Sequence, residues 1–584
     1  MQQKYVIYQV FTRLFGNTQQ TYIPWGSSEQ NGIGKFSHFT AKALQAIKEL
    51  GVTHIWYTGV PHHALLTDYR EYGIRNDHPC VVKGRAGSPY AVKDYYSVNP
   101  DLADNPDKRQ EEFDALVART HAHGLKVIID IVPNHVARCY QGLNNPGGVT
   151  DLGAGDNTSV AYARDNNFYY IPQQAFDVPE IPDEYQTLIK EFSTQPYLEY
   201  PAKWTGNAAR TAKPDFTDWY ETAKINYGVR PDGSKDFPEL PDDYAEKDDY
   251  QHYAFWQDKD VPNSWIKFRD IALYWLDKGV DGFRYDMAEM VPVEFWSYMN
   301  ASIKMRNPDA FLLAEVYQPH LYHDYLYKGK MDYLYNKVDL YDLLKNIIQK
   351  KASTREIVTV QQRLADIEPH MLHFLENHDE QRIASPEFAG NPNLARPAML
   401  LSATLSKSPT MIYFGQEVGE AGSEQAGFGQ PSRTSIFDYI GVPAHQRWMN
   451  NGKFDGGQLS EQEKSLRQFY QSVLNFSLQT KALTGRYHDL YTVNQDNMGA
   501  GQDDCFLFAR RLDQQIVIVA VNFNPIQGFH FPVHIPQELE LTENQYCLRE
   551  MIIGDNNIKI DGNAGEITGG LTLPPLAALA FCSE

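Results

Sequence analysis

Three acidic residues, Asp286, Glu315 and Asp379, each stand at or shortly after the end of a short apolar run. They belong to the clusters GFRYD at 282–286, AEVY at 314–317 and ENHD at 376–379. Short apolar runs bounded by polar residues are typical of buried parallel strands, so we expect these carboxylates just beyond strand ends. A fourth polar cluster, DIVPNH at 130–135, also ends an apolar run. In a closed barrel, residues beyond the carboxyl ends of the strands face one common mouth. The pattern therefore predicts that the four clusters meet at the mouth of the barrel.

Neighbouring carboxylates can cleave a glycosidic bond. One carboxylic acid protonates the leaving oxygen, and in retaining enzymes a second carboxylate, about 5–5.5 Å away, attacks the anomeric carbon. Crowding raises the pKa of at least one of them, which keeps an acid protonated near neutral pH. Arg284 lies two residues before Asp286, so both side chains leave one face of a strand, and the guanidinium favours the ionised carboxylate. Single carboxylates after strands are often helix caps, but four clusters on one face favour a functional site.

The elements that must position these residues alternate between strand and helix patterns. Short β-rich runs are separated by longer segments with apolar residues at helical spacing. About eight strand–helix units are counted, the number that closes a (β/α)8 barrel, so the predicted fold is an α/β TIM barrel. The expected strands are Tyr5–Val10, Thr53–Tyr57, Lys126–Ile131, Gly282–Tyr285, Phe311–Ala314, Met331–Tyr335, Leu372–Leu375 and Thr410–Phe414.

Two stretches depart from this alternation. Residues 136–257 are rich in Pro, Gly, Asn, Asp and Tyr with weak periodicity, which indicates a loop-rich subdomain inserted after the third strand. From residue 482 the pattern changes to short alternating strands typical of an antiparallel β domain. We therefore predict a first barrel part at 1–135, the inserted subdomain at 136–257, a second barrel part at 258–481 and a C-terminal β-sandwich domain at 482–584.

The composition excludes several classes of partner. The 584 residues include 53 basic and 74 acidic side chains, a formal net charge of −21, which disfavours nucleic acid and anionic membranes and fits a neutral substrate. The sequence shows no CxxC zinc motif among its five cysteines and no apolar run long enough to span a membrane. No signal-like segment precedes the first strand, so we expect a cytoplasmic protein; an exported protein whose signal has been removed is the alternative. The oligomeric state is left open.

The four clusters resemble, in order and in strand position, the four signature regions of glycoside hydrolase family 13, the α-amylase family. The resemblance spans nearly the whole chain, including the insertion and the C-terminal β domain. It implies a retaining hydrolase of α-glucosidic bonds that works through a covalent glycosyl-enzyme intermediate. Asp286 matches the family's nucleophile and Glu315 its general acid/base. Asp379 matches the carboxylate that grips sugar hydroxyls and stabilises the transition state.

The resemblance also implies residues that bind the substrate. Arg284 matches the arginine that keeps the nucleophile ionised and oriented, and His135 and His378 match histidines that hydrogen-bond the same sugar. Tyr90 matches a tyrosine that stacks on the glucose ring, a contact that suits an aromatic face. A lone histidine is more often a structural residue, but these two stand beside Asn134 and Asp379.

In many family members a calcium ion ties the inserted subdomain to the barrel. Asn134 matches one ligand position and Asp215 another. Calcium prefers oxygen ligands of this kind, although an asparagine after a strand can also simply cap the chain. Calcium is therefore an expected cofactor, with capping as the alternative, and no organic cofactor is expected.

The sequence departs from the starch-cleaving members of the family in one segment. Those enzymes often carry Lys-His three and four positions after the nucleophile, where this chain has Glu289 and Met290. The run DMAEMVPVEFW at 286–296 is locally similar to the neopullulanase and cyclomaltodextrinase branch. We expect an α-1,4-glucan or maltodextrin substrate and leave the subfamily open. The alternatives are an α-glucan transglycosylase that uses the same carboxylates and a non-catalytic barrel, as in transporter-associated relatives.

Overall fold

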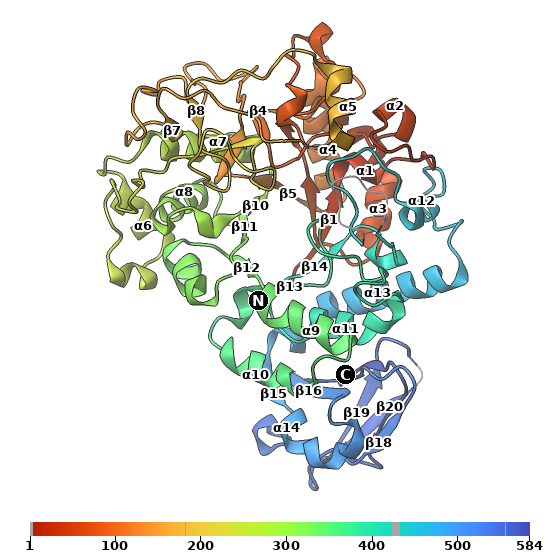
Figure 1. Ribbon diagram of the computed structural model, residues 1–584. Helices are drawn as coiled ribbons and strands as arrows, with labels where there is room; N and C mark the ends of the chain where they lie inside the picture. Colours follow the sequence, from red (N-terminus) through yellow and green to blue (C-terminus); the bar gives the residue numbers. More distant parts are fainter. Residues whose placement is uncertain (1–3, 182, 423–431, 555, 584) are drawn as a thin grey trace.

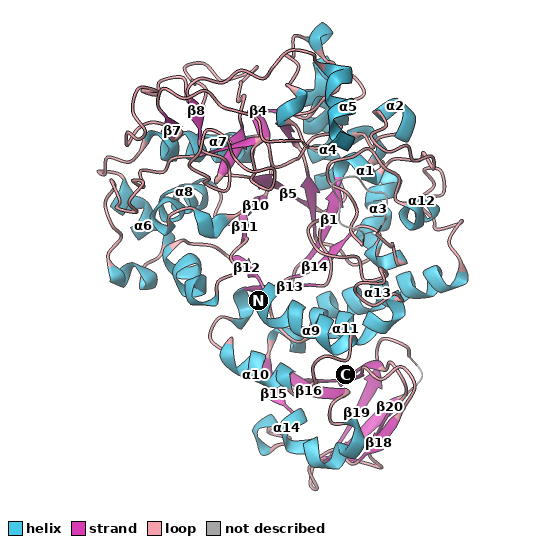
Figure 2. Ribbon diagram, viewed as in Figure 1, coloured by secondary structure: helices cyan, strands magenta, loops and turns pink. Residues whose placement is uncertain are grey.

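The computed structural model describes residues 4–181, 183–422, 432–554 and 556–583. Its centre is a closed barrel of parallel strands in the order β1-β14-β13-β12-β11-β10-β5-β2 (Figures 1 and 2). The strands are β1 (Val6–Phe11), β2 (His54–Thr58), β5 (Lys126–Ile131), β10 (Gly282–Tyr285), β11 (Phe311–Ala314), β12 (Tyr333–Tyr335), β13 (Met371–Phe374) and β14 (Thr410–Tyr413). The predicted TIM barrel is confirmed.

The barrel closes between the first and the last of these strands. β1 pairs with β14 on one side and with β2 on the other. Almost every residue of the eight strands is buried, because their inner side chains fill the barrel and their outer side chains meet the helices. Because both faces of each strand are buried, the strands appear in the sequence as continuous apolar runs.

Helices cover the outside of the barrel (Figure 2). They are α3 (Ala41–Glu49), α4 (Arg109–Ala122), α7 (Asn263–Asp277), α8 (Val293–Arg306), α9 (Asp342–Ile348), α10 (Glu356–Arg363), α11 (Arg396–Thr404) and α13 (Glu461–Gln479). The connection from β11 to β12 differs from the rest, because it contains only a 3₁₀ turn and the π-helical turn Asp324–Lys328. Among the described helices, none is both long and apolar enough to cross a membrane.

The segment between β5 and β10 contains little regular structure. Two short antiparallel pairs hold it together, β6 (His135–Ala137) with β9 (Thr222–Lys224) and β7 (Tyr170–Ile171) with β8 (Ala202–Lys203). It also contains α5 (Asp183–Phe192) and α6 (Asp249–Trp256), and α6 packs on α8. The bounds given above for an inserted subdomain stay a prediction.

The C-terminal part is an antiparallel β domain, which confirms this element of the predicted fold. Its larger sheet has seven strands in the order β15-β16-β17-β23-β19-β20-β21, and β18 pairs with β22 beside it. In Figure 1 the domain lies beyond α10 and α11, and α11 contacts β17 and β23. The strands are β15 (Arg486–Asp489), β16 (Cys505–Leu512), β17 (Gln515–Asn522), β18 (Phe529–Phe531), β19 (Gln545–Glu550), β20 (Asn557–Asp561), β21 (Glu566–Ile567), β22 (Leu571–Leu573) and β23 (Ala578–Ser583).

Candidate active site

The predicted carboxylates come together at the carboxyl ends of three barrel strands. Asp286 is the first residue after β10, Glu315 the first after β11, and Asp379 follows β13 by five residues. Close approach of β10 and β11 depends on Gly282, where a Cβ atom would lie 2.2 Å from the carbonyl oxygen of Phe311. Glycine is required there because any side chain would push the two strands apart.

The Arg284 guanidinium lies at the centre of this cluster and is fully buried. Its Nη1 is 2.9 Å from Oδ1 of Asp286 and 3.5 Å from Oδ1 of Asp130. Its Nη2 is 3.2 Å from Oε2 of Glu315 and 3.9 Å from Oδ2 of Asp379. One fixed cation therefore faces four carboxylates that come from four strands, and its 2.9 Å contact with Asp286 is a charge-assisted hydrogen bond.

The charges in the cluster do not balance. Burial, followed by the neighbouring Glu315 carboxylate, raises the pKa of Asp286 well above its ordinary range, while Arg284 opposes the rise. Although its partial burial acts the other way, His378 and Arg284 lower the pKa of Asp379 to about 2. Four carboxyl groups thus share one guanidinium, and the repulsion between neighbouring carboxylates opposes the ionisation of all four at once.

Two donors fix the carboxylate of Glu315. The backbone N–H of Met287 donates to Oε2 at 2.8 Å, and the hydroxyl of Tyr317 donates to Oε1 at 2.7 Å. Met287 has a φ of 48°, in the left-handed region that a side chain such as methionine rarely adopts. This backbone conformation, directly after Asp286, points the N–H of Met287 at Glu315. Backbone strain of this kind is concentrated at functional sites.

Tyr90 and His378 form one wall of the site. The Tyr90 hydroxyl is 2.5 Å from Nε2 of His378 and 3.4 Å from Oδ1 of Asp130, and the two rings stack with centroids 5.2 Å apart. His378 Nε2 also lies 2.9 Å from Oδ2 of Asp379, and its Nδ1 is 2.8 Å from the Nε2 of Gln9. The predicted sugar-binding residues Tyr90 and His378 therefore belong to the same cluster as the carboxylates.

His135 lies on β6 at the edge of this wall, and its ring is 5.3 Å from that of Trp219. Its Nδ1 accepts a hydrogen bond from Nδ2 of Asn134 at 3.0 Å, an assignment that follows from the amide donor. Burial, with the nearby Lys224 and Lys83, lowers the pKa of His135 to about 3. The imidazole is therefore neutral at pH 7 and can both donate and accept.

The two predicted metal ligands are not brought together. Oδ1 of Asn134 accepts a hydrogen bond from Nζ of Lys224, and its Nδ2 also donates to the Gly206 carbonyl at 3.0 Å. Asp215 is exposed; its backbone N–H donates to Oδ2 of Asp218, and its carbonyl accepts from the backbone N–H of Asp218. In the part of the chain that the structure describes, no group of three or more His, Cys, Asp or Glu side chains could hold a metal ion.

The carboxylate of Glu289 binds the backbone of the chain itself. Its Oε2 accepts the backbone N–H groups of Tyr317 at 2.8 Å and of Gln318 at 3.1 Å. The hydroxyl of Tyr325 donates to the Glu289 carbonyl at 3.0 Å. This carboxylate therefore holds the loop that follows Glu315.

Several contacts were not identified as functional from the sequence. Asp130 pairs in register with Arg284 across β5 and β10, and its Oδ2 accepts from the Trp56 indole at 2.8 Å. Tyr335, from β12, accepts from Nε of Arg284 at 3.4 Å. Side chains alternate between the two faces of a strand, and this alternation could have placed Asp130 on the same face as Arg284. Tyr317 carried no such signal, because a tyrosine three residues after a strand is common.

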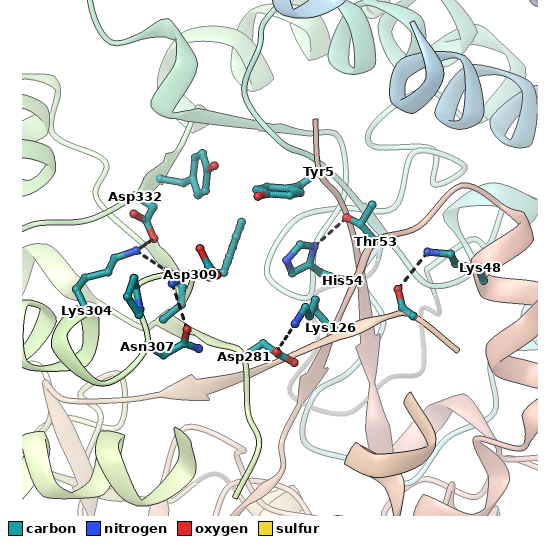
Figure 3. A pocket seen from close by; sticks show the side chains of 15 residues that line it. Tyr5, Lys48, Thr53, His54, Lys126, Asp281, Lys304, Asn307, Asp309 and Asp332 are labelled. Atoms are coloured by element: carbon teal, nitrogen blue, oxygen red, sulfur yellow. Dashed lines mark hydrogen bonds and ion pairs between the residues drawn. The ribbon is translucent and has the colours of Figure 1, made fainter. Parts of the chain in front are cut away.

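A pocket lies at the opposite end of the barrel from the carboxylates. Tyr5 precedes β1, His54 begins β2, and Asp281 precedes β10, so their side chains meet at the amino ends of the strands (Figure 3). Its charges pair with each other, as between Lys126 and Asp281 at 3.0 Å. This end of a TIM barrel supports stability, whereas chemistry occurs at the carboxyl ends.

The chain is similar to known proteins in sequence and in fold. The family model described as "Alpha amylase, catalytic domain" matches residues 9–188 and 244–472. Neopullulanase 2 of Thermoactinomyces vulgaris is 21% identical over 532 residues, 88% of this chain and 69% of that protein. Intracellular maltogenic amylase of Bacillus subtilis is 20% identical over 536 residues, covering 88% of this chain and 68% of the relative.

A solved cyclomaltodextrinase structure has the same fold, with a TM-score of 0.64 and 18% identity over 99% of this chain and 78% of that one. The family model covers well over half of the chain and includes β10, β11 and β13 with the residues that follow them. The family resemblance drawn from the four clusters is thereby confirmed. The chain belongs to the α-amylase family of glycoside hydrolases.

Proposed function

We propose that this enzyme is a retaining hydrolase of α-1,4-linked glucans or maltodextrins and that it works through a covalent glycosyl-enzyme intermediate. The observation that carries the proposal is the contact of Asp286 and Glu315 with adjacent nitrogens of one guanidinium, at 2.9 and 3.2 Å. Sharing a single planar group favours the separation of about 5–5.5 Å of a retaining pair over the roughly 6.5–9.5 Å that an inverting pair needs for its water.

In the first step a carboxylate oxygen of Asp286 attacks the anomeric carbon. Glu315 gives its proton to the glycosidic oxygen, the bond to the leaving sugar breaks, and Asp286 becomes esterified. Glu315, now a carboxylate, takes a proton from water, whose oxygen attacks the anomeric carbon and releases Asp286. The carboxylate of Asp379 stabilises the positive charge of the oxocarbenium-like transition state and binds sugar hydroxyls, while the fixed guanidinium of Arg284 orients the Asp286 carboxylate.

The relatives narrow the expected substrate and location. They are a neopullulanase, a cyclomaltodextrinase and an intracellular maltogenic amylase, which supports a maltodextrin substrate and a cytoplasmic location for this enzyme. Glu289 supports the same view, because it holds the loop at Tyr317 and Gln318 instead of offering a cation to a long starch chain.

Time-resolved product analysis tests the function. Incubation with maltohexaose, cyclodextrin, pullulan and starch should release shorter maltodextrins, fastest from the small substrates, and proton NMR should show the α-anomer first. A variant with Asp286→Asn, prepared identically, controls for contaminating amylase. Products longer than the donor would instead establish a transglycosylase. A β-anomer would exclude the retaining mechanism, and no cleavage of any α-glucan would exclude the substrate class.

Removal of the Tyr90 ring should weaken substrate binding and catalysis together. Tyr90→Ala loses an aromatic contact and a hydroxyl bonded to His378 and Asp130, so kcat/KM should fall about 10²-fold, from losses of roughly 1 kcal/mol for the ring and about 1–3 kcal/mol for the two hydrogen bonds. Tyr90→Phe keeps the ring and should retain more activity than Tyr90→Ala. Equal activities of the two variants would show that the ring contributes nothing. Steady-state kinetics on maltohexaose measures both.

A further inference from the structure

Lys224 links two parts of the chain that are far apart in sequence. Its backbone lies on β9, opposite His135 of β6. Its ammonium donates to Oδ1 of Asn134, the residue that ends the turn after β5, and to the Met290 carbonyl at 3.2 Å in the loop after β10. The contacts span 90 residues in one direction and 66 in the other.

The place of this ammonium is the one where the family resemblance located a calcium ligand. Calcium takes about six to eight oxygen ligands, several of them anionic. Here Asn134 offers one amide oxygen, already bound to Lys224, while its Nδ2 is engaged by Gly206 and His135. A positive charge in direct contact with that oxygen repels a divalent cation. The amide oxygen of Asn134 already contacts an ammonium, and Asp215 lies exposed with its backbone N–H bonded to Asp218, so the residues present do not fit calcium at Asn134.

The structure assigns the ammonium of Lys224 the role expected of that ion: we propose that it joins the segment between β5 and β10 to the barrel and makes this junction independent of metal. An ammonium suits the position because it has donors for both oxygens and no acceptor to satisfy. The ammonium is part of the Lys224 side chain, so a chelator cannot remove it.

The contact of Lys224 with Met290 also connects Lys224 to the loop that positions Glu315, the predicted acid/base. Met290 directly follows Glu289, whose carboxylate binds the backbone of Tyr317 and Gln318. Tyr317 in turn donates to Glu315. Lys224 is therefore a positioning residue at the outer end of a chain of contacts, and its loss should disturb stability first and activity second.

Thermal unfolding of the full chain, with excess EDTA or with millimolar calcium, tests the proposal. The wild-type midpoint should be the same in both, and elemental analysis after purification without chelator should find far less than one calcium per chain. Lys224→Met should lower the midpoint by about 2–6 °C, because two hydrogen bonds from a charged group are lost and their acceptors remain partly buried. Calcium should not restore it.

Lys213→Met is the matched control, since Lys213 is an exposed lysine of the same segment, 3.7 Å from Asp177, and its change should leave the midpoint unmoved. If Lys224→Met does not fold, Lys224→Arg keeps the charge and should fold and stay insensitive to EDTA. A wild-type midpoint that falls in EDTA and recovers with calcium would overturn the proposal. So would a Lys224→Met variant as stable as the wild type.

Discussion

Asp286→Asn should lower kcat on maltohexaose by at least about 10⁴-fold, the scale on which enzymes lose rate when a member of the catalytic set is removed. Under the proposed mechanism the amide cannot form the glycosyl ester, so the covalent step is lost, while the sugar-binding residues remain. The hydrogen bond from Nη1 of Arg284 at 2.9 Å still finds an acceptor in the amide oxygen, and the side chain keeps its shape.

The same change should not destabilise the fold. Burial and the Glu315 carboxylate raise the pKa of Asp286 in the folded chain above its unfolded value, so the ionised form costs stability that grows as the pH rises above the unfolded value near 4. A neutral asparagine removes that cost. The unfolding midpoint of Asp286→Asn at pH 7 should therefore equal or exceed that of the wild type, as measured by calorimetry.

Asp332→Asn is the matched control for the nucleophile prediction. Asp332 is a carboxylate at the opposite, amino end of the barrel, 2.8 Å from Nζ of Lys304. Its conversion should leave kcat near the wild-type value, because Asp332 lies far from the strand ends that carry the proposed catalytic residues. Near-normal activity of Asp286→Asn would show that another group attacks the sugar.

Arg284→Met should cost about 3–5 kcal/mol of folding stability, the range measured when one partner of a buried ion pair is removed. Methionine fills much of the space but leaves Asp286, Asp130 and Glu315 without their shared cation. Equilibrium unfolding in urea should show the loss at pH 7, and it should shrink at lower pH as the stranded carboxylates take up protons. Activity should fall by several orders of magnitude, because the carboxylates lose both orientation and charge compensation.

Arg306→Met supplies the comparison for Arg284→Met, since Arg306 pairs with Asp277 on the surface, where both side chains are more than half exposed. An exposed pair contributes about 0–1 kcal/mol, so this variant should unfold close to the wild type. If Arg284→Met and Arg306→Met had equal midpoints, the buried guanidinium would not be holding the site together.

The barrel was predictable because its strands are buried on both faces. The expected runs at Lys126–Ile131, Gly282–Tyr285 and Phe311–Ala314 coincide with β5, β10 and β11, since apolar continuity marks a strand between core and helices. The unit between β11 and β12 was less predictable, because its π-helical turn at Asp324–Lys328 lacks the length on which helical periodicity depends.

The site was predictable wherever a residue lies at the end of a strand, as Asp286 and Glu315 do. Contacts made by long side chains from distant segments were not. Lys224 is one lysine among the loop-rich residues after β5, and its partner Asn134 lies 90 positions earlier. Nothing in the local pattern marks such a pair, because the pairing of β6 with β9 places them together only in the folded chain.

The seam between β1 and β14 has a consequence for biosynthesis. As the ribosome releases the chain from its amino end, Val6–Phe11 emerges early, but its partner Thr410–Tyr413 follows some four hundred residues later. At roughly 5–20 residues per second, the first strand waits on the order of half a minute with one edge unpaired. Unpaired strand edges invite aggregation. Yield in cells should therefore depend on translation speed and on chaperones that shield the nascent first strand.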